Sequence, residues 1–242
     1  MASEIKLWQL SKGKLQKLEN ESFSANYLEE QLENLIAENS SLLGDDLLVI
    51  DRQREIRGVG VFDLLCLDMQ GKLVIVELKR DQTPREAVAQ ALHYASWLDG
   101  ADESEVLENA EDYLQSTLEV AFEKRFGTRM PEIDPKRHRI ILAAPRLDIA
   151  AEAIVNYLNE RYSVDINAVF FRYARLGDGQ EVLARTVLVP DEIRKVRTAA
   201  RRLPTIAELE AVADQRQAHP IMEICRQASE FLKEETDKAY GK

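Results

Sequence analysis

Residues 61–79 constrain the fold of this chain most, because two short apolar runs in them are interrupted by three charged side chains. The runs are rich in Val, Leu and Ile and flank a Gly-containing turn, a pattern typical of a β-hairpin. Asp63 interrupts the first run, and Glu77 and Lys79 interrupt the second. Ionised groups in buried strands are costly unless they are paired or bind a metal, so these three residues are candidates for function.

The length of the turn decides whether the three charged side chains share a face. Side chains alternate along a strand, so Glu77 and Lys79 point to the same side. A two-residue loop at 70–71 would leave Asp63 on the opposite face. A three-residue loop at 69–71 places Asp63 opposite Glu77 and puts its glycine where a left-handed residue is needed. We therefore predict the three-residue loop.

Two carboxylates with an ammonium group beside them suit phosphodiester hydrolysis. Their oxygens can hold a hard divalent cation and keep the lysine close to a bound water. The spacing of Asp63, thirteen residues and then Glu77-Leu78-Lys79 resembles the core motif of the PD-(D/E)XK nuclease superfamily. Phe62 replaces the Pro that often precedes the aspartate. The alternative is an edge hairpin whose charges face solvent, and the flanking sequence has to decide between the two.

The segment after Lys79 predicts a helix and adds a second motif. Residues 83–86, Thr-Pro-Arg-Glu, read as an N-cap, a proline at the first helical position and a capping-box glutamate. We predict a helix from here to about Leu98. Gln90 and Tyr94 lie one turn apart on it and resemble the Gln-x-x-x-Tyr motif of RecB-like nucleases. That resemblance implies support of the metal site or contact with phosphate.

Upstream, residues 23–39 predict an amphipathic helix, followed by a strand that ends near Gln53. Its buried stripe is expected to consist of Leu28, Leu32, Leu35 and Ile36. The segment 29–33, Glu-Glu-Gln-Leu-Glu, resembles the Glu-x-x-Leu-Glu segment of the NucS (EndoMS) endonucleases. The resemblance implies that Glu33 reaches the metal site, whereas we expect Glu29 to be a solvated charge. Residues 54–60 are expected to form a loop at the mouth of the site.

The combined resemblance spans residues 29–98 and implies a divalent-metal-dependent DNA endonuclease or exonuclease of repair or defence. It implies that Asp63 and Glu77 bind Mg²⁺, with Mn²⁺ as a substitute, and that Glu33 binds the metal or supports its water. Lys79 would orient or help to deprotonate the attacking water. The separate N-terminal DNA-binding domain of NucS is not expected in this chain, so mismatch recognition is not carried over. A homodimer is left open.

The net charge of −11 is at first sight unfavourable for binding DNA. Residues 99–123 hold nine acidic residues and no Lys or Arg, so the rest of the chain carries only −2. The candidate phosphate contacts are Arg52, Arg54, Arg57, Arg194, Lys195, Arg197, Arg201 and Arg202. The first three are equally suited to balancing nearby acids, and the others to complementing a helix dipole.

The rest of the chain predicts an α/β fold, a restriction-endonuclease-like mixed β-sheet flanked by helices. The expected elements are a helix over 106–126, a strand over 139–144, a helix over 149–161 and strands over 164–173 and 182–189. We predict an N-terminal hairpin extension at 1–20 anchored by Trp8, a nuclease-like domain at 21–190 and a helical C-terminal segment at 191–242.

Other classes of protein are disfavoured by the sequence. There is no run of eighteen apolar residues and no basic-then-apolar start, so we expect a cytoplasmic protein that does not bind membranes. Cys66 and Cys225 are expected to be unlinked thiols. The three histidines lack zinc-ligand spacing. Two rivals to the nuclease remain, a catalytically inactive nuclease-fold module for nucleic-acid binding or assembly and a purely structural interaction protein.

Overall fold

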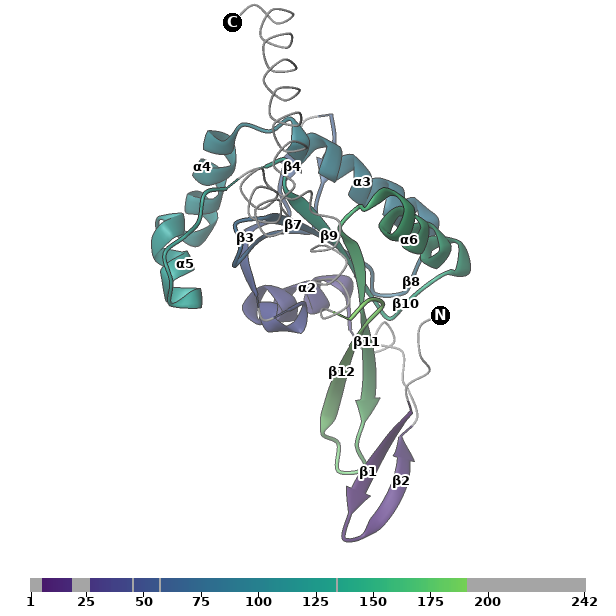
Figure 1. The fold of residues 1–242 in the computed structure, drawn as a ribbon. Helices are drawn as coiled ribbons and strands as arrows, with labels where there is room; N and C mark the ends of the chain where they lie inside the picture. The colour runs from purple at the N-terminus through teal and green to yellow at the C-terminus, as the bar shows by residue number, and fades with distance from the viewer. Residues whose placement is uncertain (1–5, 19–26, 45, 57, 134, 191–242) are drawn as a thin grey trace, which may run out of the picture. The chain divides into compact units, whose positions relative to one another are not determined.

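The computed structural model describes residues 6–18, 27–44, 46–56, 58–133 and 135–190 (Figure 1). The chain divides into two units, Met1–Asp191 and Glu192–Lys242, and everything below belongs to the first. The predicted helical C-terminal segment, with its five basic candidates, lies outside the described residues, as do Arg57 and Cys225. The predicted domain boundaries stay predictions.

A six-stranded sheet with the order β12-β11-β9-β7-β6-β3 forms the centre of the unit. Its strands are β3 (Leu47–Arg52), β6 (Leu64–Asp68), β7 (Leu73–Leu78), β9 (His138–Ala144), β11 (Ile166–Arg175) and β12 (Glu181–Val187). Strands β7, β9 and β11 run parallel, and the outer pairs are antiparallel. Strand β7 is buried along its whole length, as expected of an apolar strand covered on both faces. The predicted mixed sheet is confirmed.

Helices cover both faces of this sheet, and alternation along β7 decides which side chain meets which helix (Figure 1). Leu73 and Ile75 belong to the core that includes helices α3 to α6, whereas Val74 and Val76 pack in the core of α2. The helices are α2 (Glu29–Glu38), the 3₁₀ turn η1 (Ser40–Leu42), α3 (Arg85–Asp99), α4 (Glu103–Leu114), α5 (Leu118–Phe126) and α6 (Ile149–Tyr162).

The hairpin β6–β7 has the predicted register. Leu64 pairs with Val76, so Asp63 and Glu77 come next in line at its open end. The Asp68 N–H donates to the Lys72 carbonyl at 2.9 Å, which leaves residues 69–71 as the loop. Gly71 has φ +80°, and a Cβ there would lie 2.6 Å from the Glu132 carbonyl oxygen. Glycine is therefore required both by the conformation and by the close approach.

Two local irregularities position the segments on either side of Asp63. The pairing of β3 with β6 shifts between Val49 and Asp51, a bulge that re-aims the residues after it. The expected loop at 54–60 instead contains a small hairpin, β4 (Glu55–Ile56) paired with β5 (Gly60–Val61). That expectation was wrong because backbone pairing orders the segment.

Two predictions about helices were also wrong. The single helix expected over 106–126 is two helices, because Gln115 is left-handed at φ 53° and the Thr117 side chain caps α5. Helix α3 does begin beside Pro84, but Pro84 is its N-cap and no side chain caps it. Thr83 belongs instead to β8 (Gln82–Thr83), which pairs with β10 (Arg146–Leu147), and Glu86 contacts its neighbour Arg85.

Helix α2 buries less of its apolar stripe than predicted. Leu32 and Ile36 are buried, but Leu28 is 59% exposed and Leu35 is 39% exposed. Glu33 is buried on the flank of the helix instead. The buried face of α2 is therefore narrower than the spacing of its leucines predicts, and it includes the charged side chain of Glu33.

The N-terminal hairpin forms as predicted, from β1 (Leu7–Ser11) and β2 (Lys14–Leu18). Its two-residue turn, Lys12-Gly13, has positive φ at both positions, which matches the twist of the two strands. The predicted anchor Trp8 is 50% exposed, so that prediction was wrong, and Leu18 is the buried residue of the hairpin. Trp8, Leu10 and Leu15 lie on the opposite face of the hairpin and are exposed.

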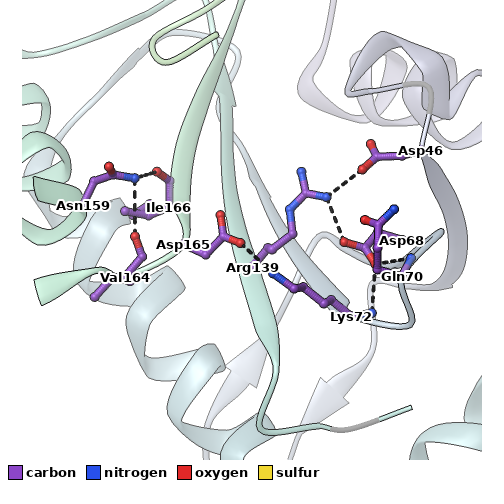
Figure 2. A network of polar contacts seen from close by, with 9 residues as sticks. All are labelled: Asp46, Asp68, Gln70, Lys72, Arg139, Asn159, Val164, Asp165 and Ile166. Atoms are coloured by element: carbon purple, nitrogen blue, oxygen red, sulfur yellow. Dashed lines mark hydrogen bonds and ion pairs between the residues drawn. The ribbon is translucent and has the colours of Figure 1, made fainter. Parts of the chain in front are cut away.

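A buried ion-pair network lies where β9 begins and β6 ends (Figure 2). Arg139 donates from Nη1 to both Asp46 and Asp68 at 3.0 Å. The second oxygen of Asp68 accepts the backbone N–H groups of residues 70 and 72 at 2.9 Å, and the Lys72 ammonium lies 3.3 Å from Asp165. Burial alone would lower the pKa of Arg139, but Asp46, Asp165 and Asp68 outweigh it and raise that pKa.

Two further findings bear on the class of protein. Cys66 is a free, buried cysteine, and burial raises the pKa of its thiol to about 12. In the part of the chain that the structure describes, no helix has the length and apolarity needed to span a bilayer. A cytoplasmic location stays a prediction.

Candidate functional site

The predicted triad comes together at the open end of the hairpin β6–β7. Glu77 lies near the end of β7 and Lys79 just after it, while Asp63 precedes β6 on the neighbouring antiparallel strand. The Lys79 Nζ lies 2.6 Å from Glu77 Oε1. Asp63 Oδ2 accepts the Leu78 N–H at 2.6 Å. The hairpin register thus fixes the two carboxylates and the ammonium group in one place.

Glu77 is the most unusual side chain of this site. It is only 1% exposed, one oxygen contacts Lys79, and its Oε2 is buried with no hydrogen-bond partner. Burial and then the charge of Asp63 raise the pKa of Glu77 to about 7, although the contact with Lys79 acts in the opposite direction. Burial likewise raises the pKa of Asp63, opposed by the Leu78 N–H and by Lys79. The site therefore holds more negative charge than its own cation neutralises.

Lys79 carries a proton at neutral pH. Burial by itself lowers the pKa of this ammonium group, but the hydrogen bond to Glu77 and the charges of Glu77 and Asp63 outweigh burial and raise it. A lysine in this state donates hydrogen bonds and attracts anions. It is suited to orienting water or a phosphate oxygen rather than to removing a proton.

Gln53 links two acidic residues of the site and was missed by sequence reasoning. Its Nε2 donates to Glu33 Oε2 at 2.7 Å and to Asp63 Oδ1 at 3.2 Å, and its backbone N–H donates to the Asp63 carbonyl at 3.0 Å. Gln53 has φ 49°, a conformation that is costly for a residue with a side chain. The sequence holds no signal for the placement of Gln53, because Gln53 directly follows β3 and the bulge in that strand sets where the strand ends.

Glu33 is buried, as its predicted role requires, but both of its oxygens have partners. One oxygen forms an ion pair with Arg52, and the other accepts from Gln53. In this arrangement Glu33 acts on Asp63 through the amide of Gln53. Its role as a metal ligand stays a prediction.

Glu29 also belongs to the site, although we expected a solvated charge. Its carboxylate accepts the Arg80 N–H at 2.9 Å, and its side chain is half-buried. The charge of Glu29 contributes to the raised pKa values of Asp63 and Glu77. The expectation was wrong because the N-terminus of α2 meets the chain directly after Lys79, a contact that no local pattern reveals.

Gln90 and Tyr94 support the segment that leads into Asp63. Gln90 donates to the Tyr94 hydroxyl at 2.7 Å, and that hydroxyl donates to the Val61 carbonyl at 2.6 Å. Tyr94 is buried, whereas Gln90 is exposed. Gly60 has φ +130°, and a Cβ there would lie 3.3 Å from the Tyr94 hydroxyl, so a larger residue would be both strained and crowded. Contact of either residue with phosphate stays a prediction.

The described basic candidates are engaged with acidic residues. Arg52 forms an ion pair with Glu33, and Arg54 forms one with Asp51 and lies 3.4 Å from the Asn109 carbonyl. These contacts favour the alternative in which the arginines balance nearby acids. Their binding to nucleic acid stays a prediction.

The chemistry of the donor set fits a hard divalent cation, with two carboxylates in place rather than the three that the resemblance implies. Asp63 and Glu77 offer carboxylate oxygens, and the unpartnered Oε2 of Glu77 lacks the positive partner that a buried carboxylate needs. Across the described ranges, no three His, Cys, Asp or Glu residues gather closely enough to hold a metal. The third predicted ligand, Glu33, is occupied as described above.

Comparison with known families identifies the segment that carries this site. Residues 28–115 match the family model described as the endonuclease NucS C-terminal domain. The matched segment runs from the start of α2 past the end of α4 and contains every described residue predicted for the site. The predicted resemblance to NucS-like domains of the PD-(D/E)XK superfamily is therefore confirmed over these residues, which are fewer than half of the 242.

Three solved structures align with parts of the chain at a TM-score of 0.36 each. A repair endonuclease from Pyrococcus abyssi is 23% identical, with 58% of this chain and 46% of that chain covered. A structure of an EndoMS complex with double-stranded DNA is 22% identical, with 57% of this chain and 42% of that chain covered. A structure of EndoMS in the apo form is 23% identical, with 58% of this chain and 45% of that chain covered. This chain thus spans less than half the length of each of them. Comparison with curated proteins finds no match.

Proposed function

We propose that this chain is a divalent-metal-dependent deoxyribonuclease of DNA repair that hydrolyses phosphodiester bonds. The observation that carries the proposal is Glu77, a buried carboxylate with one unpartnered oxygen, placed beside Asp63 and Lys79. Such a group is costly to keep unless function requires it. The match of residues 28–115 to the NucS C-terminal domain supports the same activity.

In this proposal Asp63 and Glu77 hold Mg²⁺, or Mn²⁺ in its place. The cation would supply charge stabilisation at the scissile phosphate and a water of lowered pKa. Because a metal ligand must be ionised, Glu77 has to lose the proton that its raised pKa favours. Lys79 orients the water or a phosphate oxygen with its ammonium group.

Surrounding groups keep the carboxylate of Asp63 in place. Gln53 ties Asp63 to Glu33, and the Leu78 N–H holds the other oxygen of Asp63. Tyr94 fixes the backbone two residues before Asp63 through the Val61 carbonyl. Rigid support of this kind is what places reacting groups accurately.

Duplex DNA is the first substrate to test, because a similar structure is of EndoMS with double-stranded DNA. Labelled duplex, flapped and single-stranded DNA should be incubated with the protein in Mg²⁺, in Mn²⁺ and in a chelator. We expect cutting with either metal, none in chelator and none by Glu77→Ala or Lys79→Ala. DNA affinity should survive in Glu77→Ala, because removing a carboxylate relieves repulsion of phosphate. Equal cutting by wild type and Glu77→Ala would contradict the proposal.

The rival function is a nuclease-fold module that binds nucleic acid without cutting it. The observation that favours it is that both oxygens of Glu33 are held by Arg52 and Gln53. Protein that binds DNA but cuts none of the panel in Mg²⁺ or Mn²⁺ would establish this rival.

A further inference from the structure

We propose that the hairpin β1–β2 is a nucleic-acid-binding arm that presents an aromatic side chain and lysines to the DNA. The inference rests on the proposed function for its choice of partner. It concerns a part of the chain that lies outside the family match at 28–115 and outside every residue of the candidate site. The observations that carry it are the charge of the hairpin and the way its two faces differ.

The hairpin is positively charged, whereas the chain as a whole is negatively charged. From Lys6 to Leu18 there are four lysines and no acidic residue, whereas the whole chain has a net charge of −11. Acidic residues flank this stretch in the sequence, at Glu4, Glu19 and Glu21. In the sequence, Lys12 and Lys14 are the lysines farthest from these acids, and in the hairpin they lie at the turn, where both are exposed. The tip of the hairpin is therefore its most basic part.

One face of the hairpin is apolar and exposed. Cross-strand partners share a face, so Trp8 lies with Lys17, and Leu10 lies with Leu15. Trp8 is 50% exposed, and both leucines are 70% exposed. Large apolar side chains exposed together on one face are typical of a surface that binds a partner.

The other face is used within the chain. It carries Gln9 and Gln16, and the Gly177 N–H, in the turn between β11 and β12, donates to Gln9 Oε1 at 3.4 Å. This contact leaves the Trp8 face as the one that can meet a partner. Trp8 shares this face with Lys17, and Lys12 lies in the turn, whereas Lys14 is paired with Ser11 on the Gln9 face close to the tip.

The chemistry of this surface fits a nucleic acid. Lysines attract phosphates, exposed aromatic rings stack on bases, and a two-stranded ribbon has the width of the major groove. The lysines thus favour a polyanion as the partner, and the exposed indole favours a polyanion that carries aromatic bases.

The first test uses the tryptophan itself. The chain has two tryptophans, and Trp97 is half-buried against Phe62. In full-length Trp97→Phe protein, emission from Trp8 alone reports on the hairpin. Adding single-stranded DNA in chelator, where the proposed cutting is off, should quench this emission and protect it from acrylamide. Emission that stays unchanged at DNA concentrations that saturate binding would overturn the proposal.

The second test measures affinity over a salt series. Lys12→Gln/Lys14→Gln should weaken binding about tenfold and make the slope of log K against log salt shallower by about 1.4 to 1.8, at roughly 0.7 to 0.9 per lysine. Trp8→Ala should weaken binding to single-stranded DNA by about tenfold. The matched control, Lys124→Gln/Arg129→Gln, removes two exposed cations elsewhere and should change the affinity less than twofold. Equal losses in the control and hairpin variants would contradict a specific arm.

Other occupants of this face give different results. Quenching by anionic lipid vesicles but not by DNA would overturn the proposal in favour of a membrane surface. Concentration-dependent dimerisation that is lost in Trp8→Ala, with DNA affinity unchanged, would overturn it in favour of a second copy of the chain.

The proposal of a nucleic-acid-binding arm and the proposal of nuclease activity can be tested independently. If wild type cuts DNA and the hairpin variants bind and cut normally, only the arm is wrong. If the hairpin variants lose affinity but wild type cuts no DNA, only the nuclease is wrong. If both hold, cutting at saturating DNA should be unchanged in Lys12→Gln/Lys14→Gln, because the hairpin raises affinity without touching the reacting groups.

Discussion

The two ends of the hairpin β6–β7 both bury acidic residues, but only one end balances them. At the end that holds the loop, Arg139 contacts Asp46 and Asp68, and every side-chain oxygen of Asp68 has a partner (Figure 2). At the open end, Glu77 keeps a buried oxygen without a partner beside Asp63. The same two strands therefore carry a structural network at one end and an unbalanced site at the other. We attribute the difference to function, because stability alone would favour balance at both ends.

The largest expected effect is on catalysis at the open end. Glu77→Gln should reduce the rate of DNA cutting by several powers of ten, since metal-ion catalysis is worth several kcal/mol. Single-turnover cutting of labelled duplex in Mg²⁺ measures the loss. The matched control is Glu55→Gln, an exposed acid on the nearby β4, which should cut at a normal rate. A normal rate in Glu77→Gln would remove the distinction between the two ends.

The next effect is on stability at the loop end. Arg139→Met leaves Asp68 buried without its cation, so the free energy of unfolding should fall by about 3 to 5 kcal/mol. Lys72→Met is the control, because its ion pair with Asp165 is longer and partly exposed and should be worth less than about 1 kcal/mol. Urea unfolding of both variants gives the comparison. Equal losses would show that the contacts of Arg139 contribute no more than the partly exposed pair of Lys72 and Asp165.

At the open end, by contrast, removing a charge should stabilise the metal-free protein. The pKa of Glu77 is raised in the folded state, so the stabilising proton is present at low pH and lost as the pH rises through about 7. At pH 8 in chelator, Glu77→Gln should therefore be more stable than wild type by about 3 kcal/mol, since the pKa is raised from 4.5 to about 7 and each pKa unit is worth about 1.4 kcal/mol. Near pH 4.5 the two should match. If the stability of wild type instead rises relative to that of the variant as the pH rises, the ionised Glu77 carboxylate is stabilised by its surroundings, which would contradict this account.

The smallest effect separates the backbone of Gln53 from its side chain. Gln53→Ala and Gln53→Gly both lose the amide that joins Glu33 to Asp63, but only glycine relieves the positive φ. The glycine variant should be more stable than the alanine variant by about 1 kcal/mol. Thermal unfolding of the pair in one buffer measures this difference. An alanine variant as stable as the glycine variant would show that the backbone there carries no strain.

Much of the site could be predicted because local rules fix it. The position of Gly71 sets the loop length, the loop length sets the register, and the register brings Asp63 to Glu77. The central strands followed from apolar runs in the same way. Each of these inferences uses residues close together in the sequence.

What could not be predicted depends on contacts between distant segments. Glu29 joins the site because α2 meets the chain after Lys79, and Gln53 joins it because a bulge in β3 sets where that strand ends. Trp8, the predicted anchor of the N-terminal hairpin, is exposed, because the sequence of a hairpin does not show which of its faces the rest of the chain covers. The break at Gln115 could have been read from Thr117, a good N-cap residue, and was not.

Binding of Mg²⁺ tests the central claim most directly, because the unbalanced charge of Asp63 and Glu77 is what a divalent cation would satisfy. Isothermal titration of Mg²⁺ at pH 8 should be done on wild type, Glu77→Gln and Arg139→Lys, the last of which keeps the charge at the loop end. We predict binding to wild type and to Arg139→Lys, with loss of binding in Glu77→Gln. Binding of equal affinity in wild type and Glu77→Gln, or no binding in any of the three, would contradict a metal site at the open end of the hairpin.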